Sequence, residues 1–243
     1  MVRPLATHAH IHLAPLDTAA HAERETTLLP RLAAAEQARY RAFSANTRRH
    51  TWLAGRELLL AALAHTQGDA DPSRLLTAEH GGVRYGKTPV HLNLSHSGEW
   101  LAAAEAPVPV GIDIERLRPR GVVAQAARMF CAKEVQHLAG ETDPLPQFYR
   151  LWTLKEAACK AAGLTVWDAL RCACFDLDAG RCHLSPPFPP GSWHFVYGDF
   201  AADWCLALAL HGADGAPEVA CWHRDGAAWR RMALSDPGTV AGG

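Results

Sequence analysis

Residues 110–115 carry the stretch Val110-Gly111-Ile112-Asp113-Ile114-Glu115, in which apolar and acidic side chains alternate. Successive side chains of a β-strand point to opposite faces, so this alternation predicts a strand with its isoleucines in the core. Asp113 and Glu115 then share the other face. Paired carboxylates suit a hard divalent cation such as Mg²⁺, and an amphipathic strand with a solvated acidic face has the same pattern.

Two prolines, Pro107 and Pro109, come directly before this strand. Proline cannot donate a hydrogen bond within a sheet, so it is typical of strand ends and connections. We therefore expect a boundary here, with an N-terminal α+β subdomain at residues 1–106 and a C-terminal α+β subdomain at residues 107–243.

Both halves of the chain show helical periodicity followed by short strands. Apolar side chains at helical spacing predict helices at 23–40 and 49–64, and a hairpin follows at 91–104. The second half predicts helices at 121–129, from 132 and at 147–162, then strands at 173–177, 193–197 and 204–210. This order favours an α+β fold with antiparallel sheets. The small and polar residues 235–243 predict a frayed tail.

The predicted helix at 147–162 carries Trp152, Glu156 and Lys160 at intervals of four, so these side chains share one face. An acid and a base one turn apart often form only a solvated ion pair. If this face instead meets Asp113 and Glu115, the third carboxylate and the ammonium would complete a site for a metal ion and a phosphate.

Two turns upstream offer candidate anion-binding groups. The segment 85–89, Tyr-Gly-Lys-Thr-Pro, presents Lys87 on a turn, and the segment 93–98, Asn-Leu-Ser-His-Ser-Gly, presents hydroxyls and an imidazole at a strand end. Arg48, Arg49 and Arg56 add positive charge nearby in sequence. An ordinary polar hairpin with solvated cations fits the same residues.

Composition excludes several classes of protein. The chain has 243 residues, 49% of them hydrophobic, and a formal net charge of −1, values that are unlike those of disordered or strongly basic chains. No apolar run approaches the roughly 20 residues of a membrane span, and no secretory signal is visible. We therefore expect a cytoplasmic protein with no nucleic-acid or membrane partner, whose seven cysteines are reduced.

Two further clusters carry weaker signals. His8, His10 and His12 alternate as on a strand, which favours a strand with one polar face over a zinc site. Cys172, Cys174, Cys182 and His183 lie close together in sequence, but their spacing does not match structural zinc sites.

Taken together, the motifs resemble the 4′-phosphopantetheinyl transferases of the surfactin-synthetase type. The resemblance spans roughly residues 49–163 and rests on five segments: Tyr85-Gly86-Lys87-x-Pro89, Asn93-x-Ser95-His96-Ser97-Gly98, Gly111-Ile112-Asp113-Ile114-Glu115, Phe130-x-x-x-Glu134 and Trp152-x-x-Lys155-Glu156-Ala157-x-x-Lys160.

The resemblance implies a pseudo-dimer of two similar α+β subdomains with the active site in the cleft between them. It implies transfer of the 4′-phosphopantetheine arm of coenzyme A to a serine of an apo acyl or peptidyl carrier protein, with release of adenosine 3′,5′-bisphosphate. Such enzymes use Mg²⁺, and a chain of this length is expected to be a monomer.

The resemblance also implies roles for individual residues. Mg²⁺ is expected on Asp113, Glu115 and Glu156, and Glu156, Lys160 and Asp113 are the expected catalytic residues. Glu134 is a supporting acidic residue. Coenzyme A contacts are expected from basic and polar side chains, namely Arg49, Arg56, Lys87, Ser95, His96, Lys155 and Lys160.

Two other functions use the same residue types. A metal-dependent phosphodiesterase or nuclease also assembles an Asp-x-Glu pair with a further Glu and Lys. A non-catalytic module that only binds coenzyme A or a carrier protein is the second alternative, and the intact set Asp113, Glu115, Glu156 and Lys160 argues against it.

Overall fold

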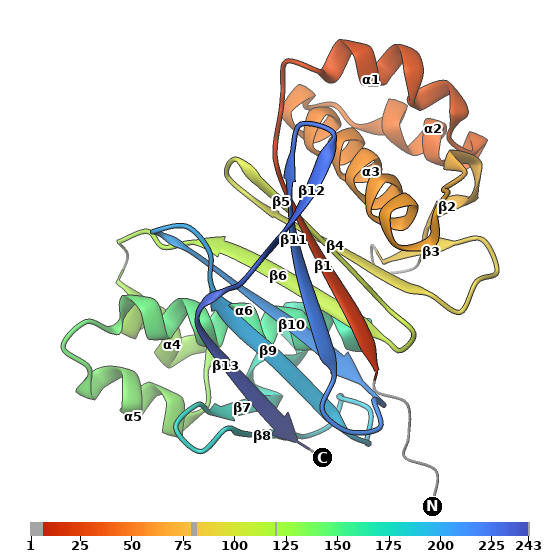
Figure 1. Ribbon diagram of the computed structural model, residues 1–243. Helices are drawn as coiled ribbons and strands as arrows, with labels where there is room; N and C mark the ends of the chain where they lie inside the picture. Colours follow the sequence, from red (N-terminus) through yellow and green to blue (C-terminus); the bar gives the residue numbers. More distant parts are fainter. Residues whose placement is uncertain (1–6, 79–81, 120, 243) are drawn as a thin grey trace, which may run out of the picture.

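The structure, a computed structural model, describes residues 7–78, 82–119 and 121–242 (Figure 1). The first half contains β1 (His8–Pro15), α1 (His21–Thr27), α2 (Ala34–Ala42), α3 (Asn46–Gln67), β2 (Leu75–Thr77), β3 (Val83–Tyr85), β4 (His91–Ser97) and β5 (Trp100–Ala106). The second half contains β6 (Val110–Arg116), α4 (Val122–Met129), α5 (Ala132–Gly140), α6 (Pro144–Ala162), α7 (Val166–Ala169), β7 (Ala173–Asp176), β8 (Arg181–Leu184), β9 (Trp193–Asp199), β10 (Trp204–His211), β11 (Glu218–Asp225), β12 (Ala228–Met232) and β13 (Ser235–Gly242).

The strands form two sheets. One has seven strands in the order β12-β11-β1-β5-β4-β3-β2, and the other has six in the order β6-β10-β9-β13-β8-β7. Most neighbours are antiparallel, and the pairs β1 with β11 and β8 with β13 are parallel. The α+β class with largely antiparallel sheets is confirmed.

Three apolar cores define the layers. The first lies between α3 and the seven-stranded sheet, and the third lies between α6 and the six-stranded sheet. Between them, a shared core holds Ile11 and Leu13 of β1 together with Ile112 and Ile114 of β6. In Figure 1, α3 lies with α1 and α2 in the upper part of the molecule, and α6 lies with α4 and α5 in the lower part. The expectation of a two-subdomain α+β fold is confirmed in these layers.

The predicted helix at 23–40 is wrong in its continuity. The chain forms α1, a short 3-10 turn at Leu29–Arg31, and then α2. Pro30 lies in the break, where its ring and its missing N–H prevent a continuous α-helix. The helix predicted at 49–64 lies within α3, which ends at Gly68 in the left-handed conformation.

The C-terminal segment differs most from its prediction. Residues 235–242 are not frayed but form β13, which pairs with β9 and buries Val240. Strands β11 and β12 were not predicted, and they complete the seven-stranded sheet beside β1. The division at residues 106 and 107 stays a prediction, and strand pairing crosses it because β11 and β12 join the strands of the first half.

No helix in the described ranges has the length and apolar composition needed to span a membrane.

Gly111 allows α6 to lie directly on β6. A Cβ atom at this position would lie 2.0 Å from the carbonyl oxygen of Ala157 on α6. Glycine within a strand is typical of such close backbone approach. The contact fixes the distance between the strand and the helix that carry the candidate site residues.

Gly111→Ala is therefore expected to lower the free energy of unfolding by about 3 kcal/mol, because the methyl group must push α6 off the sheet. Gly140→Ala is the matched control, since a Cβ there meets open space, and its effect should stay within about 1 kcal/mol. Denaturant melts of the two variants measure the difference. Equal stability of both would show that α6 and β6 are not in contact at Gly111.

Candidate functional site

The acidic residues of β6 face α6. The strand alternation puts Ile112 and Ile114 in the shared core, and Asp113 and Glu115 therefore point to the opposite face. On α6, Glu156 lies within the electrostatic influence of both carboxylates. The three acids predicted to act together are thus brought into one neighbourhood.

Lys160 holds the deepest of these acids. Its Nζ donates to Asp113 Oδ1 at 2.7 Å, to Ser95 Oγ at 3.1 Å and to the carbonyl oxygen of Ile112 at 3.1 Å. Asp113 is only 5% exposed, and its other oxygen, Oδ2, is buried without a hydrogen-bond partner among the described residues. A buried carboxylate oxygen of this kind needs a cation or a donor to balance it.

Strand β4, in the first half of the chain, supplies polar side chains that form hydrogen bonds with β6. Ser95 Oγ donates to Asp113 Oδ1 at 2.7 Å, and Ser97 Oγ donates to Glu115 Oε2 at 2.9 Å. Asn93 Oδ1 accepts a hydrogen bond from the backbone N–H of Ile112 at 3.0 Å. The acidic cluster therefore lies where β4 of one half meets β6 of the other.

The electrostatics of the cluster show in Glu156. Burial raises its pKa to about 7, and repulsion from Asp113 and Glu115 adds to the rise, while Lys160 opposes it. A carboxyl group with a pKa near neutrality can hold or release a proton under ordinary conditions.

In protein freed of divalent ions by a chelator, Glu156→Gln should become more stable than wild type as the pH rises. The unfolded carboxyl ionises near 4.5 and the folded one near 7, so the folded state loses stability between these values. We expect the Tm difference to be small at pH 5 and to reach the equivalent of roughly 1 to 3 kcal/mol at pH 8. The exposed Glu23→Gln is the control, and a Tm difference that does not change with pH would contradict the assignment.

The donor set fits a hard dication. All three side chains offer carboxylate oxygens, the ligands that Mg²⁺ prefers, and Asp113 Oδ2 is buried without a partner in the described chain. Among the described residues, the three acids do not bring ligand atoms within 4.8 Å of one another as a set, and Lys160 lies against Asp113. Asp113, Glu115 and Glu156 are the residues that would hold such an ion.

Two of the predicted anion-binding residues, Lys87 and His96, are exposed. The pKa of His96 is lowered by partial burial of its ring and by the Lys160 ammonium nearby, and Asp113 opposes this shift. His96 therefore lies close to the acidic cluster.

The two predicted arginines have partners within the first half. Arg56 is buried and donates to Glu36 Oε2 at 2.9 Å and to Thr77 Oγ1 at 2.6 Å. The guanidinium of Arg49 lies 5.9 Å from the ring centre of Tyr40. The charge of Arg56 is thus already balanced by Glu36.

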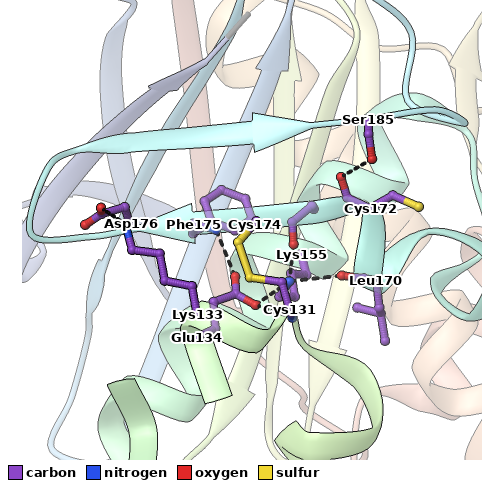
Figure 2. The surroundings of a disulfide bond; sticks show 11 residues. Cys131, Lys133, Glu134, Lys155, Leu170, Cys172, Cys174, Phe175, Asp176 and Ser185 are labelled. Carbon is purple, nitrogen blue, oxygen red and sulfur yellow. Dashed lines mark hydrogen bonds and ion pairs between the residues drawn. A yellow bond between two sulfur atoms is a disulfide. The ribbon is translucent and has the colours of Figure 1, made fainter. Parts of the chain in front are cut away.

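Lys155 and Glu134 are not part of the cluster around Asp113. Lys155 has no exposed surface, and its Nζ lies 2.8 Å from Glu134 Oε2 and donates to the carbonyl oxygens of Leu170 and Ala173 (Figure 2). In this arrangement Lys155 has no surface with which to contact a ligand. Its predicted contact with coenzyme A stays a prediction that this burial does not support.

Glu134 connects three elements. Its carboxylate accepts from the backbone N–H of Cys131 at 3.0 Å, which caps α5, and from that of Phe175 on β7 at 2.8 Å. Together with Lys155 of α6, these bonds join α5, β7 and α6. Glu134 thus supports the helix that carries the site, and does so from its buried side.

The expectation that all cysteines are reduced is wrong for one pair. Cys131 and Cys174 form a disulfide beside Glu134 (Figure 2). The pairing joins the start of α5 to β7 across 43 residues, and no spacing motif in the sequence indicates it. Cys131, Cys174 and Glu134 are also the only described group with three ligand-type atoms within 4.8 Å, but the disulfide and the bonds to Glu134 already use these atoms.

Three residues that build the cluster, Asn93, Ser97 and Gly111, were part of the quoted motifs but were given no individual role from the sequence. The first two belong to a polar alternation on β4, with Ser95 between them, and this period of two was the available signal. Gly111 was visible as a glycine inside a strand pattern, which indicates close backbone approach.

Comparison with known proteins adds independent evidence. Residues 109–209 match the model of the family described as the 4′-phosphopantetheinyl transferase superfamily. A "4′-phosphopantetheinyl transferase" of Bacillus subtilis is 32% identical over 159 residues, which cover 61% of this chain and 67% of that protein.

Two other relatives match over shorter stretches. The "4′-phosphopantetheinyl transferase Sfp" of Bacillus subtilis strain 168 is 33% identical over 47% of this chain and 52% of its own length. The "4′-phosphopantetheinyl transferase AcpT" of Salmonella typhi is 36% identical over 50% of this chain and 62% of its own length. The chain thus spans between about half and two thirds of these three relatives.

Proposed function

Because the chain belongs to the 4′-phosphopantetheinyl transferase superfamily, as an enzyme of the Sfp type, we propose that it transfers the phosphopantetheine arm of coenzyme A to a carrier protein. The acceptor is a serine of an apo acyl or peptidyl carrier, and the second product is adenosine 3′,5′-bisphosphate. We further propose that the enzyme requires Mg²⁺ and acts as a cytoplasmic monomer without nucleic-acid or membrane partners.

The observation that carries this proposal is the cluster of Asp113, Glu115, Glu156 and Lys160 between β6 and α6. Mg²⁺ held by the three carboxylates would neutralise charge on the pyrophosphate of coenzyme A. Lys160 lies against Asp113, and its ammonium can donate to a phosphate oxygen once the carboxylate has another partner.

The transfer breaks a phosphoanhydride bond of coenzyme A and forms a phosphoester bond to the carrier. The serine Oγ of the carrier forms a bond to the β-phosphorus of coenzyme A, and the bond from that phosphorus to the bridging oxygen breaks. The bridging oxygen leaves with adenosine 3′,5′-bisphosphate. Glu156, with its pKa of about 7, accepts the serine proton in our proposal, directly or through a water molecule.

The 3′-phosphate end of coenzyme A provides a separate test. His96 is exposed beside the cluster, and Lys87 is exposed on the turn before β4. We propose that both contact this phosphate, with Ser95, Arg49 and Arg56 supporting the same region. Lys87→Ala and His96→Ala should each weaken coenzyme A binding by about tenfold and leave 3′-dephospho-coenzyme A binding nearly unchanged. Calorimetry with both ligands measures this, and equal losses for the two would place the residues at another phosphate.

The carrier has a candidate docking surface next to α6. A pocket of about 590 Å³ is lined by Trp152, Met129, Leu170, Arg128, Arg171, Gln125 and Trp167, and Trp167 is 81% exposed. Trp152 belongs to the same helix face as Glu156. Apolar rings flanked by two arginines suit an acidic helical partner, so we propose that the carrier docks here with its serine near Glu156.

A further inference from the structure

A second group of metal-type ligands lies between α3 and the seven-stranded sheet, on the face of β1 opposite the core shared with β6. His10 and His12 alternate with Ile11 on β1, and they therefore face away from the shared core. Glu105 on β5 pairs directly with His10, so its side chain lies on the same face of the sheet. His65, in the last turn of α3, contacts His12 of this group.

Two of the imidazoles already lie at the spacing that one metal ion requires. His12 Nε2 and His65 Nδ1 share a hydrogen bond at 3.1 Å, which a bound ion would replace. Two nitrogens on a tetrahedral zinc ion, each about 2.0–2.1 Å from the metal, are separated by about 3.3 Å. Figure 1 shows the strand of His12 in the middle of its sheet, with α3 packed over it.

Unpartnered polar atoms concentrate at this group. Eight buried side-chain atoms of the described chain lack a hydrogen-bond partner, and four of them are His10 Nδ1, His12 Nδ1, Glu105 Oε2 and Trp222 Nε1. His12 has no exposed surface, and Glu105 is only 6% exposed. Buried polar atoms without partners are rare in folded proteins and indicate a ligand, an ion or ordered water.

The ligands are in the protonation state that a metal needs. Burial lowers the pKa of His12 to about 3, and burial also lowers that of His10. Both imidazoles are therefore neutral at pH 7, with a nitrogen lone pair available to an ion. His65 acts electrostatically on both, so it lies near the two at once.

We propose a binding site for a zinc-type divalent ion that links α3 to the sheet. Its ligands are His12 and His65, together with His10 and Glu105. Imidazole nitrogens with one carboxylate are a donor set that Zn²⁺ prefers and Mg²⁺ does not. His12 and His65 are in place. Among the described residues no third ligand atom lies within 4.8 Å of the pair, so His10 and Glu105 would reach the ion by rotation of their side chains.

The aromatic neighbours give the site a specific optical signal. The rings of Trp229 and His12 are 4.7 Å apart, and those of Trp222 and His65 are 4.6 Å apart. A bound Co²⁺ ion is therefore expected to quench the fluorescence of both indoles. The quenching should be largely lost in the double variant Trp222→Phe and Trp229→Phe, although the other tryptophans remain.

The test uses the full chain without a histidine tag, stripped of metal and kept in excess Mg²⁺ to occupy the acidic cluster. Zn²⁺ competed against a chromophoric chelator should bind at one ion per chain, and His65→Gln and His10→Gln should each weaken binding at least tenfold. His65 is exposed, so its variant is expected to fold. His137→Gln on α5 is the matched control and should bind Zn²⁺ as wild type does.

Thermal melts give a second readout. Zn²⁺ should raise the Tm of wild type and of His137→Gln, and it should not raise that of His65→Gln. Unchanged Zn²⁺ affinity in both His65→Gln and His10→Gln would overturn the proposal. So would the absence of stoichiometric binding, or a thiolate charge-transfer band of Co²⁺ that disappears in Cys131→Ser, because the ion would then lie at the cysteines.

Discussion

Asp113→Asn and Glu156→Gln should each reduce the rate of phosphopantetheine transfer by at least about 100-fold at saturating Mg²⁺ and coenzyme A. Both changes keep the size of the side chain and remove one negative charge. Asp113 is the acid that Lys160 and Ser95 hold in place, and Glu156 is the acid whose pKa lies near 7. Removal of either charge weakens the metal site, and loss of Glu156 also removes the proposed proton acceptor.

The measurement is the initial rate of carrier modification, with circular dichroism and Tm as checks of the fold. Asp203→Asn is the matched control, because Asp203 is an exposed acid that pairs with Arg116 at the end of β6. Its turnover should equal that of wild type. Wild-type turnover by Asp113→Asn or Glu156→Gln would contradict the assignment of these residues as metal ligands. A large drop in the Tm of either variant would mean that its loss of activity comes from unfolding.

Lys155→Met should lower the free energy of unfolding by about 3–5 kcal/mol, the largest effect on stability that we expect. Lys155 and Glu134 are both buried, and their charged atoms lie 2.8 Å apart. Burial lowers the pKa of Lys155 and Glu134 opposes this shift. Loss of the ammonium removes the cation that balances the Glu134 carboxylate, which is only 2% exposed.

Lys133→Met is the matched control for this change. Lys133 pairs with Asp176 at 2.5 Å on the neighbouring surface, and its side chain is 70% exposed, so its removal should cost at most about 1 kcal/mol. The double variant Glu134→Gln with Lys155→Met should recover part of the loss, since it leaves no unpaired charge. If the double variant is less stable than Lys155→Met alone, the pair is not the cause of the effect.

The sequence predicted the parts of the site that depend on local periodicity. The period of two placed Asp113 and Glu115 on one strand face, and the period of 3.6 placed Glu156 and Lys160 on one helix face. Family resemblance placed Lys155 at the ligand although it is the neighbour of Glu156. On a helix, the side chains of adjacent residues point about 100° apart. This geometry predicts that Lys155 and Glu156 face different surroundings.

The features that the sequence did not predict depend on pairing between distant segments. Strands β11 and β12 reach the first sheet because β11 lies beside β1 in a parallel pair, and no local pattern specifies such a partner. The disulfide between Cys131 and Cys174 has the same origin, since the fold brings α5 to β7. The break at Pro30 was visible in the sequence and should have divided the first predicted helix.

The central claim is that this chain attaches phosphopantetheine to a carrier serine, and mass spectrometry of apo carrier proteins tests it directly. After incubation with the wild-type chain, coenzyme A and Mg²⁺, we predict that the carrier gains the mass of one phosphopantetheine arm, and that a chelator or Glu156→Gln prevents the gain. An unchanged carrier mass across apo acyl and peptidyl carriers would contradict the claim. Hydrolysis of coenzyme A in that case would identify a phosphodiesterase, and binding of intact coenzyme A would identify a non-catalytic module.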